Sequence, residues 1–493
     1  MKRLCIFLIM LGVAAALPAF ASKKTRGAGC EYVVMASYDV KGDAAWMEAV
    51  ETLRERHGAE VLFYAGAPRE RLDALRGLSP RYVAVVEKPE NLDRDYVIDL
   101  NKLSREVDGD IYADFLWGIV TGYDAAAAMR MVEESAEPLV VRSAVATITE
   151  LDSAKWFDRY GWVDDHTRGL WGEKRAAGAE VVTGRIAPEQ VLPKFMELYA
   201  EYDPDLVVTA AHATERNLEM PFSLGFIIPE AGRLVGSRSL SVADKIGDLR
   251  SSGRRKVYFA VGNCLIGNVN NTRGSMAVAW MNDAAAVAMV GYVVTTWHGR
   301  NGWGGLKYWL TMPGRYTLAE AIYMNQQDML CQMDGWCPAM LREDYPCFGD
   351  REFSEAPAAL HELMGKEPTH DQLGFWHDRD VLAYYGDPKW DVRLQRIECE
   401  NDYDVDFKVR GRKCVITVTT HDDFSLDRMK GGRFKEEHVL DLPFSYFFPV
   451  RLKNPRLAGG QAWKAAVDEN FLLIYDCGFE RGSKYEIRLD IDR

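Results

Sequence analysis

The chain is organised around the segment Lys256–Gly267, which reads KVYFAVGNCLIG. Its first residues form a short apolar run rich in β-branched and aromatic side chains, which is typical of a buried parallel strand. The run breaks at Gly262 and presents Cys264 just past its carboxyl end. A second stretch, Asp205–Thr214 (DLVVTAAHAT), presents His212 in the same way. Because ligands of open α/β sheets bind outside the carboxyl ends of the strands, we expect the thiol and the imidazole to meet in one crevice.

The segments before this pair alternate between strand and helix patterns. Residues 31–37, 43–56 and 60–64 give an apolar run, a helical pattern and a second apolar run, which is a βαβ opening. Residues 188–202 have a helical pattern and lead into the strand before His212. The alternation predicts a mostly parallel sheet with helices on its faces.

The segments after Cys264 continue the alternation and then become irregular. Residues 275–288 read as a small-residue helix, residues 290–296 as a buried strand, and residues 297–305 as a Gly/Trp loop. Residues 331–380 are rich in Cys, Pro, His and acids, and we expect them to wrap the domain without regular structure.

The C-terminal part changes to alternating apolar and polar residues, for example over residues 404–409 and 414–420. Short strands without long helices predict an antiparallel β-sandwich, which we expect to be immunoglobulin-like (Ig-like). The predicted organisation is α/β, with a two-part parallel sheet sandwiched by helices and followed by this sandwich. Its parts are a signal peptide (1–21), an N-terminal α/β subdomain (30–150), a catalytic α/β subdomain (151–395) and the C-terminal β-sandwich (396–493).

The composition indicates a folded protein that does not bind nucleic acid. Of the 493 residues, 48% are hydrophobic and 27% charged, which is ordinary for a globular chain. The formal net charge is −13 and the pI is about 5.3. A general nucleic-acid binder needs a basic face, so this class is excluded.

The N-terminus reads as a secretory signal peptide. Lys2 and Arg3 give the positive end, residues 4–17 the apolar stretch, and residues 19–21 an A-x-A site with cleavage after Ala21. We therefore expect a secreted, periplasmic or cell-surface protein that is not an integral membrane protein after cleavage. The alternatives are a membrane anchor, for which the apolar stretch is short, and a lipid attachment site at Cys30.

Cys264 and His212 together have the chemistry of nucleophilic catalysis. A nearby imidazole lowers the pKa of a thiol and can protonate a leaving amine. The backbone N–H groups of Cys264 and Ala213 would stabilise the developing oxyanion. The alternative is that Cys264 is a structural cysteine at a strand end and His212 a satisfied polar side chain, since both are common in proteins.

Six segments resemble the gingipain family of caspase-like (clan CD) cysteine peptidases over roughly residues 30–395. They are DIYADFLWGIVTGYDAAAAMRM (110–131), DLVVTAAHAT (205–214), VYFAVGNCLIG (257–267), GSMAVAWMNDAAAVAMVG (274–291), VVTTWHGRNGWGG (293–305) and LAYYGDPKWDVRL (382–394). His212 precedes Cys264 by 52 residues, close to the roughly 50-residue spacing of caspases. The resemblance implies a caspase/gingipain-like fold, with Cys264 as nucleophile and His212 as general base and acid.

Other site residues follow from the same resemblance. It implies that Trp297 and His298 border the pocket for the residue before the cleaved bond, and Asn263 also joins the predicted pocket. Asp114, or alternatively Asp110, is the candidate to orient His212 because we expect its segment at the same sheet edge. His298 is a second candidate for the catalytic histidine.

No metal or cofactor is predicted, although a structural calcium ion stays open. A zinc site among Cys331, Cys337, Cys347 and the later histidines lacks the usual paired spacing. The same three cysteines are candidates for disulfides in an exported protein, and so are Cys399 and Cys414.

The sequence thus predicts an exported cysteine endopeptidase that hydrolyses protein or peptide substrates through a thioester. One alternative is a catalytically inactive surface or binding protein that keeps the fold. A transpeptidase or other acyl transferase with the same dyad is a third reading. The oligomeric state is not predicted.

Overall fold

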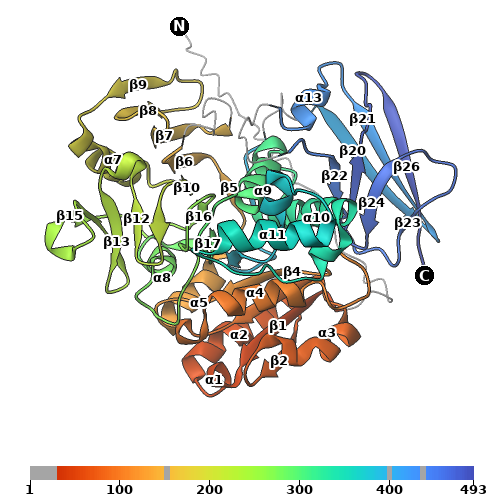
Figure 1. Cartoon of the computed structure of the whole chain (residues 1–493), viewed down its shortest axis with the longest axis horizontal. Coiled ribbons are helices and arrows are strands. Elements are labelled where there is room, and N and C mark those ends of the chain that lie inside the picture. The colour runs from red at the N-terminus through yellow and green to blue at the C-terminus, as the bar shows by residue number, and fades with distance from the viewer. Residues whose placement is uncertain (1–29, 149–155, 397–401, 433–439, 493) are drawn as a thin grey trace, which may run out of the picture.

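The computed structural model describes residues 30–148, 156–396, 402–432 and 440–492. They form a mixed α/β region around one large sheet, followed by two separate antiparallel sheets at the C-terminus (Figure 1). The predicted signal peptide and Cys399 lie outside the described residues.

The large sheet has twelve strands in the order β2-β1-β3-β4-β18-β17-β16-β10-β6-β7-β8-β9. Its strands are β1 (Tyr32–Ser37), β2 (Glu60–Tyr64), β3 (Tyr82–Val86), β4 (Leu116–Val120), β6 (Ser143–Ala146), β7 (Arg159–Val163), β8 (Leu170–Lys174), β9 (Val182–Arg185), β10 (Leu206–Thr209), β16 (Lys256–Ala260), β17 (Ala286–Tyr292) and β18 (Leu382–Tyr385). The central strands β1, β3, β16 and β17 are buried along their whole length, which explains their continuous apolar sequences.

Two blocks of parallel strands run in opposite directions in this sheet. The strands from β2 to β18 are parallel, and so are those from β17 to β7. The blocks meet at the antiparallel pair of β17 and β18. The sequence predicts the two-part sheet but not this reversal, because β18 comes from a distant segment and inserts between β4 and β17. As a result, the carboxyl ends of β10 and β16 lie at the same edge as the amino end of β4.

Helices cover the sheet and connect its strands. They are α1 (Tyr38–Lys41), α2 (Ala44–His57), α3 (Leu72–Leu78), α4 (Arg94–Leu103), α5 (Ala125–Glu134), α7 (Val191–Tyr202), α8 (Met276–Asn282), α9 (Arg300–Thr311), α10 (Leu318–Trp336), α11 (Glu352–Met364) and α12 (His370–Asp378). Helix α7 buries Leu192, Phe195 and Tyr199 on one stripe, as an amphipathic helix on a sheet does. A capping box of Thr317 and Glu320 begins α10.

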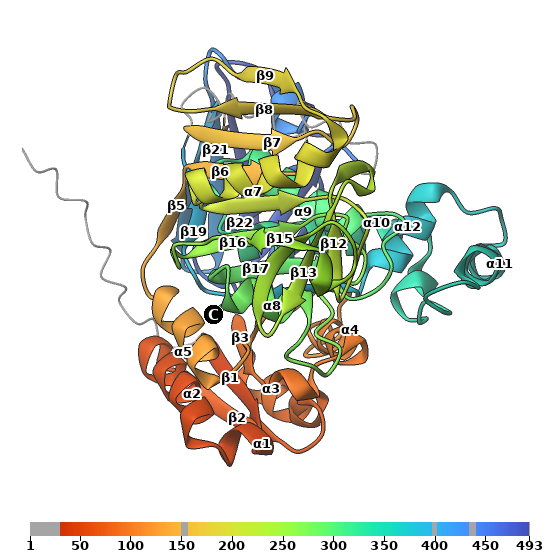
Figure 2. The same ribbon diagram turned by 90° about the vertical axis from the view of Figure 1, so that its left-hand side faces the viewer.

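Three regions differ from the sequence prediction. The helix predicted over residues 275–288 ends at Asn282, because Ala286–Tyr292 pairs with β16 and β18 as the strand β17. The predicted Gly/Trp loop is mostly the helix α9, because its glycines allow close packing. A Cβ on Gly302 would lie 2.2 Å from the Val261 carbonyl oxygen, and one on Gly304 would lie 2.1 Å from Asn325 Oδ1. The segment predicted to be irregular contains α11 and α12, whose apolar side chains share a small core with the end of α10. Figure 2 shows α11 and α12 projecting from the main body.

A five-stranded antiparallel sheet follows β10 directly. It contains β11 (Ala213–Thr214), β12 (Asn217–Glu219), β13 (Phe226–Glu230), β14 (Arg233–Ser237) and β15 (Lys245–Asp248), paired in that order. In addition, β5 (Leu139–Val141) pairs in parallel with β19 (Val392–Leu394). The edge strand β11 begins one residue after His212, so this sheet starts at the candidate site.

The C-terminal part forms two antiparallel sheets, as the sequence predicts. One contains β20 (Tyr403–Arg410), β21 (Lys413–Thr420), β26 (Lys484–Asp490) and β23 (Arg456–Leu457), and the other β22 (Phe444–Phe447), β25 (Phe471–Tyr475) and β24 (Lys464–Asp468). The short helix α13 (Leu426–Met429) lies between β21 and β22 in the sequence. Their buried side chains share one core. The Ig-like character of this part stays a prediction.

Among the described residues, no helix has the length and apolar character needed to cross a membrane. Seven cysteines of the described part of the chain are unpaired, including Cys331, Cys337 and Cys347. The structure therefore does not form the disulfides for which these three residues were candidates.

Candidate active site

The strands β10 and β16 are parallel neighbours, as the site prediction requires. Val208 pairs with Phe259, and Thr209 with Ala260. The Val261 N–H continues the ladder by donating to the Thr209 carbonyl oxygen at 3.0 Å. His212 and Cys264 follow within a few residues of these strand ends, so both segments leave the sheet at one edge.

The side chain of Asn263 ties the two segments together. Its Oδ1 accepts a hydrogen bond from Thr209 Oγ1 at 2.6 Å, and its Nδ2 donates to the Ala211 carbonyl oxygen at 2.7 Å. Asn263 is fully buried. These contacts give Asn263 a positioning role between the strand ends, instead of the substrate-pocket role expected from the sequence, because both ends of its amide are already bound.

Replacing Asn263 with alanine should lower the free energy of unfolding by about 1–3 kcal/mol, because the Ala211 carbonyl group loses its buried partner. Urea denaturation measures this change. The variant Thr209→Val removes the hydroxyl partner while nearly keeping the shape. If the two groups form one tie, Asn263→Ala and Thr209→Val combined will cost less than the sum of the single changes. If the losses in unfolding free energy of the two single variants simply add in the double variant, the two side chains do not act as one tie.

Cys264 lies against the backbone that follows β17. The Thr296 N–H points to its sulfur, with a nitrogen–sulfur distance of 3.3 Å. Burial raises the pKa of the Cys264 thiol, and the nearby backbone N–H groups of Thr296 and Cys264 offset this effect only in part. An adjacent imidazole would lower the pKa of this thiol, so in this arrangement the thiol is less acidic than the sequence predicts.

The residue after Cys264 has a strained backbone. Leu265 has a φ of 58°, which is unusual for a large residue without a special role. Its N–H donates to the Val294 carbonyl oxygen at 2.9 Å, which fixes this conformation. Strained residues of this kind cluster at active sites. A single sequence does not reveal this feature, because nothing in the residue type of Leu265 suggests a positive φ.

His212 is exposed at the edge of the five-stranded sheet. The Glu219 N–H donates to its carbonyl oxygen at 2.9 Å, so the backbone is fixed. Within the described residues, no hydrogen bond or ion pair to its imidazole is found. Ala213 follows as the first residue of β11 and is buried. The imidazole therefore has room to reorient, and the oxyanion role of Ala213 stays a prediction.

Trp297 and His298 follow Thr296, whose backbone N–H contacts the Cys264 sulfur. Trp297 is 44% exposed, and its ring contacts that of Phe353 with centroids 4.8 Å apart. Burial lowers the pKa of His298 to about 4, so its imidazole is neutral near pH 7 and is a weak base. This property does not favour His298 as the catalytic histidine.

Asp114 and Asp110 do not lie beside His212. The loop that contains them precedes β4, and β4 is four strands away from β10 in the sheet. At a spacing of about 4.8 Å per strand, this corresponds to roughly 19 Å. Asp114 Oδ2 accepts a hydrogen bond from the Val107 N–H at 3.0 Å, and the Asn470 side chain donates to the Asp114 carbonyl oxygen. Asp114 lies at the predicted edge of the sheet, but the structure does not bring it to His212 and Cys264, because the strands β18, β17 and β16 lie between β4 and β10.

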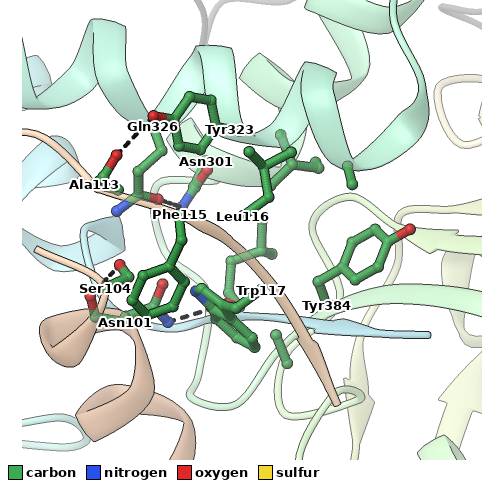
Figure 3. A pocket seen from close by; sticks show the side chains of 14 residues that line it. Asn101, Ser104, Ala113, Phe115, Leu116, Trp117, Asn301, Tyr323, Gln326 and Tyr384 are labelled. Carbon is green, nitrogen blue, oxygen red and sulfur yellow. Dashed lines mark hydrogen bonds between the residues drawn. The ribbon is translucent and has the colours of Figure 1, made fainter. Parts of the chain in front are cut away.

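A small cavity lies between α4, α10, β4 and β18 (Figure 3), and neither Cys264 nor His212 is among the residues that line it. Its volume is about 40 Å³, enough for one or two water molecules. Polar groups of Asn101, Asn301 and Gln326 meet apolar side chains such as Phe115 and Leu116 in its lining. A cavity of this size does not hold a peptide.

The structure gives no support for a metal centre within its described residues. In those residues, no group of three or more His, Cys, Asp or Glu side chains is arranged to hold a metal ion. The zinc reading of the cysteines and histidines after residue 330 is therefore not supported.

Comparison with known proteins gives structural matches only. No known family model and no curated protein matches this chain. The fold is similar to the structure titled Arg specific cysteine proteinase gingipain R (RgpB), with 9% identity, a TM-score of 0.43, and coverage of 96% of this chain and 94% of that chain. A complex of the Porphyromonas gingivalis RgpB pro- and mature domains matches with 10% identity, a TM-score of 0.41, and coverage of 94% and 93%.

A third structure, titled only as a protease, has 10% identity and a TM-score of 0.39 over 79% of this chain and 84% of that chain. None of these scores reaches 0.5. Gingipains are thus among the solved structures to which this chain is similar, as the sequence resemblance led us to expect.

Proposed function

We propose that this chain is an exported cysteine endopeptidase in which Cys264 attacks the peptide carbonyl group and His212 transfers the proton. The observation that carries the proposal is the tie made by Asn263, which holds the segments of both residues at one edge of the sheet. The strained turn at Leu265 supports the same placement.

The proposed reaction has two steps. His212 takes the proton of the Cys264 thiol while the sulfur attacks the carbonyl carbon, and it then gives this proton to the leaving amine. Water subsequently hydrolyses the thioester and regenerates the thiol. Because burial raises the pKa of Cys264 in the free protein, His212 acts as a base during the attack and does not form a permanent ion pair. The backbone N–H of Cys264 is the proposed oxyanion donor, and Trp297 the proposed substrate contact.

One observation favours a second function. A partly buried thiol with a raised pKa and an exposed histidine are also what a catalytically inactive protein with this fold would contain. In that case the chain binds a partner and does not hydrolyse it.

The alkylation rate of Cys264 distinguishes the two functions. We expect iodoacetamide to label Cys264 at pH 7 at least about tenfold faster in the wild type than in His212→Ala, because the imidazole accepts the thiol proton. Mass spectrometry of the peptide containing Cys264 gives the rate. His361→Ala, which removes a half-exposed histidine on α11, serves as the control and should change nothing. Equal rates in the wild type and in His212→Ala would favour the inactive binding protein.

A further inference from the structure

The indole of Trp297 is held by a buried carboxylate that the sequence analysis does not single out. Glu352 is the first residue of α11 and only 2% exposed. Its Oε2 accepts a hydrogen bond from Trp297 Nε1 at 3.1 Å. Its Oε1 accepts one from the Tyr345 hydroxyl group at 2.8 Å and lies 3.2 Å from His377 Nε2. Both carboxylate oxygens are therefore occupied.

This contact continues into the core of the α/β region. His377 Nδ1 lies 2.6 Å from Asp378 Oδ1, and both side chains are fully buried. Asp378 Oδ2 accepts hydrogen bonds from the Tyr292 hydroxyl group at 2.8 Å and from the Asn301 N–H at 3.0 Å. Tyr292 ends β17 and Asn301 lies in the first turn of α9, so the chain of polar contacts fixes Glu352 relative to the sheet.

Trp297 is one residue beyond the backbone N–H that touches the candidate nucleophile. Because the Thr296 nitrogen is 3.3 Å from the sulfur, the Trp297 backbone lies within about 9 Å of it. The adjacent Phe353 is 65% exposed and packs edge-on against the indole. A solvent-exposed pair of large aromatic side chains thus adjoins, through Trp297, the backbone segment that contacts Cys264.

We propose that Glu352 is a positioning residue for substrate specificity. It fixes the Trp297 indole so that Trp297 and Phe353 receive a large apolar side chain from the substrate residue next to the scissile bond. This inference rests on the proposed function. An apolar side chain fits best because the Glu352 carboxylate is engaged by Trp297, Tyr345, His377 and the Gly349 N–H, and does not face the substrate as a free charge.

Covalent peptide probes test the proposal directly. Three acyloxymethyl ketone peptides that differ only in the residue before the ketone (Phe, Arg or Ala) would be compared by their second-order rates of Cys264 labelling. In the wild type we expect the Phe probe to react at least about tenfold faster than the other two. In Glu352→Ala the Phe probe should slow about tenfold through weaker binding, while the rates of the Ala probe and iodoacetamide change less than about twofold.

Glu352→Gln keeps an acceptor for the indole N–H and should restore the Phe rate to within about threefold. Glu355→Ala, on the same helix, is the matched control, since its carboxylate pairs with the exposed Arg351 and does not contact Trp297. If Glu352→Ala does not fold, as judged by circular dichroism, Trp297→Phe is the second variant. It removes the indole N–H that donates to Glu352 and should give the same selective loss of the Phe-probe rate.

Two outcomes would overturn the positioning role. One is an equal loss of labelling rate in Glu352→Ala with all three probes and with iodoacetamide, which would indicate a merely structural residue. The other is a higher labelling rate with the Arg probe than with the Phe probe in the wild type. Failure of the proposed function looks different, because wild-type Cys264 would then react slowly with iodoacetamide as well as with every probe.

Discussion

Replacing Cys264 with alanine should abolish peptide-bond hydrolysis, with a loss of at least about 10³-fold, because no other group can form the thioester. The fold should persist, since the substitution removes one partly buried sulfur whose main contact is the Thr296 backbone. Fluorescence release from labelled casein measures the activity, and circular dichroism confirms that the variant is folded.

The matched control is Cys347→Ala, which removes another unpaired, partly exposed cysteine after α10. This variant should keep full activity. Undiminished hydrolysis by Cys264→Ala would place the nucleophile elsewhere. Absence of hydrolysis in the wild type, together with slow alkylation of Cys264, would favour a binding protein.

Local sequence patterns predict the strands that carry the dyad. The apolar runs before His212 and Cys264 form β10 and β16, which are parallel neighbours, because a buried parallel strand needs a continuous apolar sequence. The alternating pattern near the C-terminus likewise predicts antiparallel sheets. These features depend on residues that are close together in the chain, so a single sequence contains them.

Features that depend on distant contacts are not predictable in this way. The strand β18 separates Asp114 from His212, and nothing near either residue indicates it. The glycines of α9 predict a loop from the sequence alone. Glycine is needed in this helix because Val261 and Asn325 pack directly against it, and these contacts are not visible in the sequence. Glu352 looks like an ordinary surface acid on a helix, and its burial against His377 depends on how α11 and α12 pack.

The acidic loop before β4 has a different role from the one predicted for it. It packs against the turn between β24 and β25, where the Tyr112 and Phe471 rings meet at 5.1 Å. Burial, together with the neighbouring carboxylates, raises the pKa of Asp114 to about 8 and that of Asp468 to about 8. The charged groups around them are Asp108, Asp110 and Glu469, with Arg451 paired to Glu469. The contact between the α/β region and the C-terminal sheets is thus built on carboxyl groups that are protonated near neutral pH.

This arrangement predicts that the protein loses stability as the pH rises. Between about pH 4 and pH 8 the folded protein holds protons on Asp114 and Asp468 that the unfolded chain releases near its ordinary pKa of about 4, so the free energy of unfolding falls with pH. We expect it to be roughly 3–4 kcal/mol lower at pH 8 than at pH 5 for one such group. Urea denaturation at several pH values, followed by tryptophan fluorescence, measures the slope.

Asp468→Asn removes one of the two titrations while keeping the shape of the side chain, so the slope between pH 5 and pH 8 should become clearly shallower and the variant more stable than the wild type at pH 8. Asp422→Asn, at an exposed position in the same C-terminal part, should leave the slope unchanged. A stability that is flat over this range, or an equal slope in Asp468→Asn and the wild type, would mean that these carboxyl groups are ionised in the folded protein. In that case a bound cation would have to compensate their charge, and the addition and removal of calcium would be the next comparison.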